Sequence, residues 1–545
     1  MNSAALVNIA AHLQEMARRQ PATPAIIFPR KGVSLSFREL NRLSDRIAHG
    51  LMAYGIGRGV RTVLMVTPGP DFFAITFALF KVGAVPVLID PGLGIRNLKK
   101  CLAEAEPHAF IGIPRAHVVR ILFGWGKETL HKFITVGPRL FLNGTTLAAL
   151  IDRRDDLPFP LAPTRRDDVA AILFTSGSTG PPKGAVYSHG NFVSQVEALR
   201  NVYDIAPGEI DLPTFPLFAL FAPALGMTAV IPEMNFARPG SVNPRRIIKA
   251  IEIYNVTTMF GSPALIDRVG RFAAKRGIRL TSLRRAISAG APVQAEVLER
   301  FTRMLNPGVE VFTPYGATEA LPVCSIGSAE ILGETRRITD SGGGICIGKP
   351  APGVRLEIIE ISDEPIPVWR DSLRVPLQKI GEIVVQGEQV TRCYYNRPDA
   401  DRLAKIADPA GNSFFHRMGD LGGKDEKGRI WFCGRKSQRV VTSLETLFTI
   451  PCEAVFNTHP HVFRTALVGV GKPGDQLPVL CVELKMGSRI DREKVRRELL
   501  EIGASHIHTH GITTILFHPG FPVDIRHNAK IFREKLASWA ARRLS

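Results

Sequence analysis

The chain has 545 residues, of which 45% are hydrophobic, enough to bury a large core and to divide into more than one domain. Its seven cysteines are scattered singly with no C-x-x-C pair, which argues against a disulfide scaffold or a zinc site and is typical of a reduced, cytoplasmic protein. The net charge of +19 comes from dispersed basic residues without a nucleic-acid-reading module, so we expect no nucleic-acid partner, whereas an acidic protein or anionic lipid stays open.

The first 150 residues alternate short apolar runs with helical patterns, which indicates parallel α/β units. We expect a strand at 62–66, a helix at 71–82 and a strand at 84–90. The same alternation predicts three further elements, namely a strand at 256–260, a helix at 263–276 and a strand at 285–288. No secretory signal is expected, because residues 1–20 lack a basic start followed by an apolar block.

Between these units, residues 212–232 carry no charge but are interrupted by four prolines, which favours a buried wall or pocket lining over a membrane helix. From 342 to 434 the sequence pattern changes to short strand-like runs separated by glycines, such as 381–385 and 429–432, which predict antiparallel sheet or barrel. A smaller α+β pattern follows Gly434-Arg435 and runs to the end of the sequence.

A glycine-rich loop, T-S-G-S-T-G-P-P-K-G, follows a strand expected at 171–174. Its glycines let successive backbone N–H groups converge on an anion, its hydroxyls add donors, and its lysine adds a mobile positive charge. Because Gly184 follows the lysine where a Walker A loop has Ser or Thr, this is a phosphate cradle of another kind. Its candidate phosphate-binding residues are Thr175, Ser176, Gly177, Ser178, Thr179, Gly180 and Lys183.

This loop resembles, nearly letter for letter, the signature of the adenylate-forming superfamily of acyl-CoA ligases, peptide-synthetase adenylation domains and luciferases. Further motifs follow in the order of that family and cover essentially the whole chain. The resemblance implies an α/β fold with a large N-terminal domain, residues 1–434, that combines two doubly wound subdomains and a distorted β-barrel. A small mobile α+β domain, residues 435–545, would carry the catalytic lysine.

The same resemblance implies the roles of individual residues in binding ATP and Mg²⁺. In Tyr315-Gly316-Ala317-Thr318-Glu319, the threonine and glutamate would hold the phosphates and the metal ion. Gly290, Ala291 and Pro292 would line the adenine, and Asp420 would bind the ribose hydroxyls. Arg435 matches the arginine that ends the large domain.

Near the end of the chain, Lys530 stands where the family has a lysine that reaches the carboxylate and the α-phosphate. A carboxylate that attacks the α-phosphate of ATP must overcome charge repulsion, so the site needs a metal ion on the phosphates and cations near the reacting phosphorus. Glu319 offers a hard oxygen ligand and Lys530 a positive charge. Taken singly, Glu319 is better explained as the start of a helix and Lys530 as a surface lysine. Only the order of all the motifs favours the catalytic roles.

Departures from the ligase pattern concern the fate of the acyl group. Many acyl-CoA ligases have P-L-x-H where this chain has Pro216-Leu217-Phe218-Ala219, so a histidine near the substrate carboxylate is missing. Gln438 occupies the probable hinge, and Ser443-Leu444-Glu445 replaces a flexible S-G-G-E loop. A bulky leucine does not take positive φ as glycine does, so a proper channel for CoA is not expected.

The stretches VFTPYGATEALPV and FPVDIRHNAKIFREKL resemble the β-lactone synthetases of bacterial long-chain olefin biosynthesis. That resemblance implies adenylation of a 2-alkyl-3-hydroxyalkanoic acid, ring closure by its own β-hydroxyl and release of AMP, which needs no CoA. It also implies assembly with other enzymes of that pathway. A long-chain fatty acyl-CoA ligase, a fatty acyl-AMP ligase and a basic scaffold with a dead site stay open as alternatives.

Phe218, Ala219, Phe221 and His189 are candidates for the wall of the acyl pocket, although core packing explains the two phenylalanines equally well and a structural hydrogen bond is favoured for His189. Two other patterns are expected to be decoys. The G-x-G-x-x-G match at 469–474 is interrupted by a proline and predicts a turn. His506, His508 and His510 would share one face only if the segment were extended, and without a nearby acid or cysteine no genuine metal site is expected.

Overall fold

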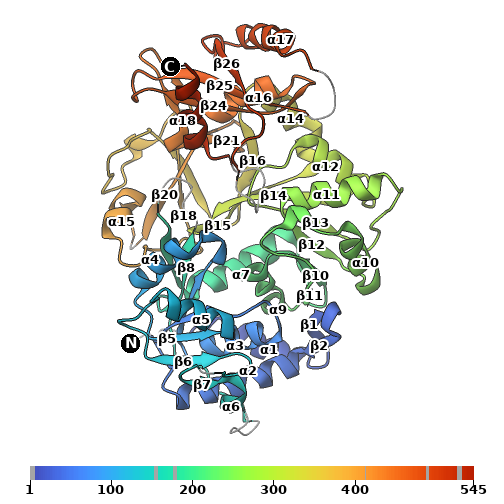
Figure 1. Cartoon of the computed structure of the whole chain (residues 1–545), viewed down its shortest axis with the longest axis vertical. Coiled ribbons are helices and arrows are strands. Elements are labelled where there is room, and N and C mark those ends of the chain that lie inside the picture. The colour runs from blue at the N-terminus through green and yellow to red at the C-terminus, as the bar shows by residue number, and fades with distance from the viewer. Residues whose placement is uncertain are drawn as a thin grey trace.

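The chain folds into successive regions that follow its sequence, from the N-terminal α/β layers at the bottom of Figure 1 to a small C-terminal region at the top. The computed structural model describes residues 6–140, 142–151, 157–175, 181–411, 413–485, 490–523 and 531–544. Of the predicted site residues, Ser176–Gly180 and Lys530 lie outside these ranges.

The first region is built on a mostly parallel sheet, in which seven described strands follow the order β7-β6-β5-β3-β4-β8-β9. The strands are β3 Arg61–Met65, β4 Val85–Ile89, β5 Ala109–Gly112, β6 Lys132–Thr135, β7 Thr145–Thr146, β8 Val169–Thr175 and β9 Lys183–Ser188. The helices are α2 Phe37–Ala53, α3 Pro70–Lys81, α4 Ile95–Ala105, α5 Pro114–Leu122 and α6 Leu147–Ile151. The strand–helix–strand unit predicted at 62–90 is confirmed as β3, α3 and β4.

The second region carries a parallel sheet in the order β14-β13-β12-β10-β11-β1, with β2 antiparallel at its edge. The strands are β1 Pro24–Phe28, β2 Val33–Ser36, β10 Ile210–Pro213, β11 Thr228–Val230, β12 Thr258–Gly261, β13 Arg285–Ser288 and β14 Glu310–Ala317. The helices are α1 Ala11–Arg19, α7 His189–Tyr203, α8 Pro216–Ala219, α9 Phe221–Leu225, α10 Pro244–Tyr254, α11 Pro263–Ala274 and α12 Ala295–Thr302. The elements predicted between 256 and 288 are confirmed as β12, α11 and β13.

An antiparallel region continues the second sheet beyond β14, in the order β15-β16-β21-β20-β18-β17, with β19 paired to β20. Its strands are β15 Ala320–Gly327, β16 Ile345–Pro350, β17 Arg355–Ile359, β18 Gly381–Gln386, β19 Lys405–Asp408, β20 Ser413–Lys424 and β21 Ile430–Arg435. Its helices are α13 Ser328–Glu330, α14 Arg336–Asp340 and α15 Pro398–Ala404. This region corresponds to the expected distorted barrel, and β18 and β21 confirm the two strands predicted in it.

The C-terminal region is a small α+β unit with a core of its own that includes Leu467, Leu480 and Leu499. Its strands are β22 Val440–Val441, β23 Thr446–Leu447, β24 Val462–Val470, β25 Leu477–Leu484 and β26 Thr514–Phe517. Its helices are α16 Thr449–Asn457, α17 Arg492–Ala504 and α18 Arg533–Leu544. Two α/β regions, an antiparallel region and a terminal α+β unit match the fold class predicted from the sequence.

The structure shows the backbone conformation of the two patterns that were expected to be decoys. Residues 469–474 connect β24 to β25, with Gly471 at φ 112° and Gly474 at φ 93°, so the predicted turn is confirmed. The His506–His510 segment is also a turn, because the His510 N–H donates to the His506 carbonyl oxygen. In the described parts of the chain no group of three or more His, Cys, Asp or Glu side chains could hold a metal ion. None of the described helices is long and apolar enough to cross a membrane.

A buried polar cluster lies where β10, β12 and β13 run side by side. The Arg285 guanidinium donates to the Glu209 carboxylate and, over 2.8 Å, to the Thr258 hydroxyl, so these charges are paired. Asp211 on β10 is only 8% exposed, and its Oδ1 has no hydrogen-bond partner among the described residues. Burial, and then the neighbouring charge of Glu209, raise the pKa of Asp211 to about 8. This carboxyl is therefore mostly protonated at neutral pH.

We expect Asp211→Asn to stabilise the fold at alkaline pH. In the unfolded chain the carboxyl ionises near its ordinary pKa, whereas in the folded chain it stays protonated until about pH 8, so folding loses stability as the pH rises between these values. The neutral amide removes this loss. Thermal unfolding at pH 8 should show an apparent Tm at least about 2 °C above that of the parent, with the difference shrinking towards pH 5. Asp475→Asn, on an exposed turn, is the control; a pH-independent difference would contradict the assignment.

Candidate functional site

The predicted phosphate loop is framed by two paired strands. Thr175 at the end of β8 is the antiparallel partner of Lys183 at the start of β9, so the two ends of the loop lie side by side. The Lys183 ammonium lies 5.0 Å from the centre of the Tyr394 ring, in a cation–π contact. The pairing of Thr175 with Lys183 therefore fixes the point at which the loop leaves the sheet and the backbone position of Lys183.

Thr318 and Glu319 form the tip of the hairpin between β14 and β15, since Ala317 pairs with Ala320 on either side of them. The Tyr394 hydroxyl donates to Oε1 of Glu319 over 2.8 Å, and the Thr391 N–H donates to the Glu319 carbonyl oxygen over 2.8 Å. Tyr187 on β9 donates its hydroxyl proton to the Thr318 carbonyl oxygen. The hairpin tip is therefore held from the antiparallel region and from the strand that follows the phosphate loop.

Tyr394, Tyr187 and Thr391 were not predicted as site residues. Tyr187 follows the phosphate loop by three residues, but no motif marks Tyr394 or Thr391, and only the folded chain brings the three residues to the hairpin tip. Burial, and then the charge of Glu319, raise the pKa of the Tyr394 hydroxyl far above its ordinary value. Tyr394 therefore keeps its proton and remains a hydrogen-bond donor to the carboxylate at any physiological pH. Desolvation lowers the pKa of nearby Lys405 to about 8.

Asp420 on β20 lies between a tyrosine and an arginine. The Tyr315 hydroxyl donates to Oδ2 over 2.6 Å, and Nη1 of Arg435 lies 3.0 Å from Oδ1. The charge of Asp420 raises the pKa of Arg435, and burial, followed by the charge of Asp420, raises the pKa of Tyr315 well above its ordinary value. Three predicted nucleotide-binding residues from three strands are thus joined by one hydrogen bond and one ion pair.

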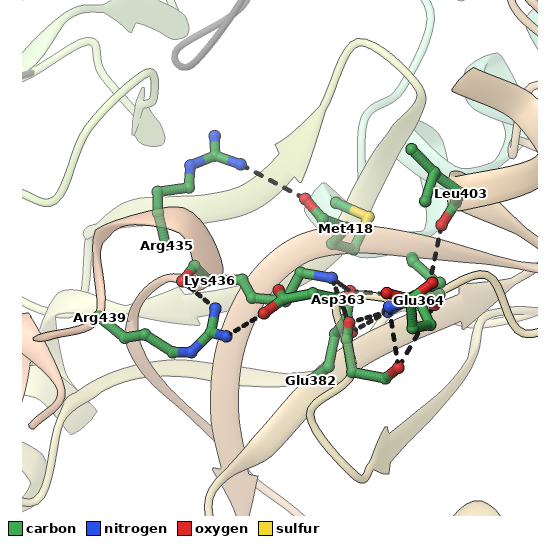
Figure 2. A network of polar contacts seen from close by, with 10 residues as sticks. Asp363, Glu364, Glu382, Leu403, Met418, Arg435, Lys436 and Arg439 are labelled. Carbon is green, nitrogen blue, oxygen red and sulfur yellow. Dashed lines mark hydrogen bonds and ion pairs between the residues drawn. The ribbon is translucent and has the colours of Figure 1, made fainter. Parts of the chain in front are cut away.

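A second buried ion cluster adjoins Arg435, as Figure 2 shows. Arg417 forms two hydrogen bonds to the Glu382 carboxylate, of 2.6 and 3.2 Å, and both side chains are almost completely buried. Lys436 places its ammonium 3.2 Å from the same carboxylate and donates to the Ser362 carbonyl oxygen. A buried carboxylate with two cationic partners is strongly fixed in position, so the chain is anchored immediately after Arg435.

A cavity of about 1810 Å³ connects the predicted site residues. Ligand pockets commonly measure about 300–1,000 Å³, so this one has room for a nucleotide together with a large apolar group. The predicted residues that line it are Lys183, Phe218, Phe221, Gly290, Tyr315, Gly316, Thr318, Glu319 and Arg435. The nucleotide residues and the aromatic residues predicted for the acyl pocket therefore face one continuous space.

Other predicted residues do not line this cavity. Ala219 is fully buried behind it, which corrects its expected place in the pocket wall, whereas Phe218 packs edge-on against Phe260 with ring centres 4.7 Å apart. His189 is also fully buried and outside the lining; its Nδ1 accepts a hydrogen bond from the Ile9 N–H over 3.2 Å. Burial lowers the pKa of His189 to about 4. This hydrogen bond is of the structural kind that the sequence favoured for His189.

Three nucleotide candidates also lie behind or beside the lining: Ala291, Pro292 and Asp420. Asp420 is covered by Tyr315 and Arg435, both of which do face the cavity.

The predicted hinge residue Gln438 ends a short 3-10 turn and accepts a hydrogen bond from Arg533 over 3.2 Å. Leu444 lies in the turn between β22 and β23 and is 93% exposed, well outside the cavity lining.

The sequence profile of the AMP-binding enzyme family matches residues 13–395, which is more than half of the chain. The chain belongs to the AMP-binding enzyme family. Two proteins named "Olefin beta-lactone synthetase" are 50% identical to it, in Xanthomonas campestris pv. campestris, and 49% identical, in Stenotrophomonas maltophilia. Each alignment covers 98% of this chain and 98% of the relative.

This AMP-binding enzyme also has the fold of a solved relative of low sequence identity. The amide bond synthetase McbA from Marinactinospora thermotolerans superposes with a TM-score of 0.81 at 21% identity, over 98% of this chain and 99% of McbA. The similarity runs through the antiparallel region and the C-terminal unit as well as through the part that the family profile matches.

Tyr315→Phe should weaken both the fold and the binding of AMP. The substitution leaves a buried carboxylate without one charge-assisted hydrogen bond, a loss of about 1.5–3 kcal/mol in the free energy of unfolding. Urea unfolding and calorimetric titration with AMP measure the two effects. Tyr395→Phe is the matched control, because the Tyr395 hydroxyl forms no hydrogen bond with a described residue. Equal stability and AMP affinity in both variants would refute a role for the Tyr315 hydroxyl.

Proposed function

We propose that this protein is an ATP-dependent β-lactone synthetase that acts on a long-chain 2-alkyl-3-hydroxyalkanoic acid. The observation that carries the proposal is the similarity, at half of all positions and over nearly the whole chain, to two proteins named "Olefin beta-lactone synthetase". The cavity supports it, since nucleotide-type residues at one end continue into the apolar wall around Phe218 and Phe221.

The first step is adenylation. A carboxylate oxygen of the substrate attacks the α-phosphate of ATP, a new P–O bond forms, and the bond to the departing pyrophosphate breaks. Lys183 and the rest of the phosphate loop are assigned to the β- and γ-phosphates, and Lys530 to the carboxylate and the α-phosphate. These cations offset the repulsion between the two anions. Gly290, Ala291 and Pro292 are assigned to the adenine, and Asp420 with Arg435 to the ribose.

The residues at the hairpin tip fit a magnesium ion on the phosphates. Mg²⁺ prefers carboxylate oxygens and a few waters, and Glu319 presents a carboxylate to the cavity with one oxygen held by Tyr394. Thr318 adds a hydroxyl beside it. When bound, the ion would neutralise charge on the phosphates. Tyr394 keeps the carboxylate oriented, which leaves the second oxygen for the ion.

The second step closes the ring inside the same cavity. The β-hydroxyl oxygen attacks the acyl carbonyl carbon and gives its proton to solvent, and the bond between the carbonyl carbon and the phosphate oxygen of AMP breaks, which gives a four-membered lactone and AMP. Because nucleophile and carbonyl belong to one molecule, no second binding step is required. The apolar lining holds the two alkyl tails away from water, and the fully buried Ala219 leaves no imidazole at the position where many ligases have one.

The mobile unit, the partners and the compartment belong to the same proposal. We assign residues 1–434 to the large domain and 435–545 to a small domain that swings about Gln438, immediately after the anchored segment Arg435-Lys436. Assembly with other enzymes of olefin biosynthesis is expected. A cytoplasmic location is supported by the cysteines, all seven of which are free thiols. Long-chain acyl-CoA ligase and acyl-AMP ligase activities are the competing functions.

One experiment separates these functions. Incubation with ATP, Mg²⁺ and a long-chain 2-alkyl-3-hydroxy acid, without CoA, should give AMP and a product one water lighter than the substrate by mass spectrometry. Lys530→Ala should reduce AMP release at least about a hundredfold, because no other assigned residue brings positive charge to the α-phosphate. An acyl-CoA that forms only when CoA is added, or an adenylate that stays bound without ring closure, would refute the lactone.

Glu319→Gln should impair the use of magnesium. The amide keeps the shape of the side chain but removes the charge that binds the ion, so we expect at least a tenfold higher Mg²⁺ concentration for half-maximal pyrophosphate release. Tyr394→Phe should shift the same curve less, since it only loosens the carboxylate. Tyr395→Phe is the control for an altered hydroxyl. A Glu319→Gln enzyme with the Mg²⁺ dependence of the parent would exclude Glu319 as the ligand.

A further inference from the structure

A surface formed by α4 and α5 exposes more apolar area than a solvated face requires. Its apolar members are Ile95, Val118, Ile121, Leu122 and Phe123, which are 44%, 43%, 55%, 73% and 42% exposed. Val118, Ile121 and Leu122 are spaced i, i+3 and i+4, so they share one side of α5. We call these residues, together with the cations described next, the α4–α5 surface; both helices pack on one hydrophobic cluster. Figure 1 shows the two helices on the same side of the first sheet.

Exposed cations surround these apolar side chains. They are Arg96, Lys99, Lys100, Arg115 and Lys127. None of the five forms an ion pair with a described residue. Of the acidic neighbours, Glu104 binds Arg397 over 2.6 Å and Glu106 lies near Arg61, whereas Glu128 is exposed beside Lys127. The surface is therefore a local concentration of the positive charge that the whole chain carries.

The same two helices line the large cavity from its other side. Ile95 and Leu98 of α4 and Ala116 and Val119 of α5 belong to the cavity lining, and Ile95 is at the same time 44% exposed. A lipid that arrives at this surface would therefore meet the apolar lining directly. This step rests on the proposed function, because it assigns a two-tailed, water-insoluble acid to the cavity.

We propose that the α4–α5 surface docks on the surface of a bilayer that contains anionic phospholipid and takes up the substrate there. Helices that lie on membranes combine an apolar side with flanking Lys and Arg, which is the arrangement of α5 and its surroundings. Each cation near an anionic membrane strengthens binding about fivefold. An acidic partner protein would pair with the cations, but it would not provide the nonpolar environment that the exposed apolar side chains of α5 require.

The test is co-sedimentation of the full-length protein with vesicles, without ATP or substrate. We expect binding to phosphatidylcholine vesicles that contain phosphatidylglycerol, at least about tenfold weaker binding to phosphatidylcholine alone, and weaker binding in high salt. Ile121→Ser/Leu122→Ser should lower the partition coefficient at least about tenfold. Ile507→Ser, which alters a side chain that is 87% exposed at the other end of the molecule, should not change it.

Lys99→Gln/Lys100→Gln, on the exposed side of α4, is a second variant in case the serine pair disturbs folding. It should weaken vesicle binding at least about tenfold while circular dichroism stays unchanged. Adenylation of a short, water-soluble 3-hydroxy acid should be the same in all variants, which separates a failure of docking from a failure of the proposed function. No binding to anionic vesicles, or equal binding of parent and both double variants, overturns the proposal; capture of an acidic protein instead of vesicles does so as well.

Discussion

The pairing of buried carboxylates with their cations is the constraint on which the rest of this structure depends. Asp420 is held by Tyr315 and Arg435, and Glu382, which is almost inaccessible to water, is held by Arg417 and Lys436. A buried carboxylate that loses a partner destabilises a fold by several kcal/mol. The strands that carry these residues, β14, β18, β20 and β21, are therefore locked into one arrangement, and the consecutive residues Arg435 and Lys436 connect the two clusters (Figure 2).

This anchoring supports the proposed hinge at Gln438, two residues after Lys436. Up to that residue the backbone is tied to buried charges, whereas Gln438 makes a single side-chain hydrogen bond of 3.2 Å to Arg533 on the C-terminal unit. Arg439, one residue later, binds Asp363 at a partly exposed position, where an ion pair contributes little. The side-chain contacts of Gln438 and Arg439 are thus weaker than those of Arg435 and Lys436, which supports the proposed hinge at Gln438, although α16 also packs against β21 and α14.

The parts of the candidate site that are contiguous in the chain could be predicted from the sequence. The loop from Thr175 to Lys183 and the hairpin tip at Glu319 were recognisable because glycines, hydroxyls and charges recur there at short spacing. Sequence reasoning did not predict Tyr394 or Tyr187, because a single tyrosine acquires its partner only when distant strands meet. It also misplaced Ala219, which faces the core because a short helix turns one side inward. The sequence predicted a buried wall or pocket lining at 212–232. The structure has four short elements there, β10, α8, α9 and β11, and several of their residues line the cavity.

The shape of the cavity links the chemistry to the surface of the molecule. Glu319, Lys183 and Arg435 give the lining a charged part, whereas the aromatic wall around Phe218 and the residues of α4 and α5 give it two apolar parts, which pack on different hydrophobic clusters. A two-tailed acid has the same polarity, with its carboxylate at one end and its chains at the other, so it can enter productively in one orientation only. Under the proposed uptake from a membrane, entry between α4 and α5 brings the tails first to the apolar side chains of Ile95, Leu98, Ala116 and Val119. The apolar part of the lining next to these helices thus fits the proposed loading from the α4–α5 surface.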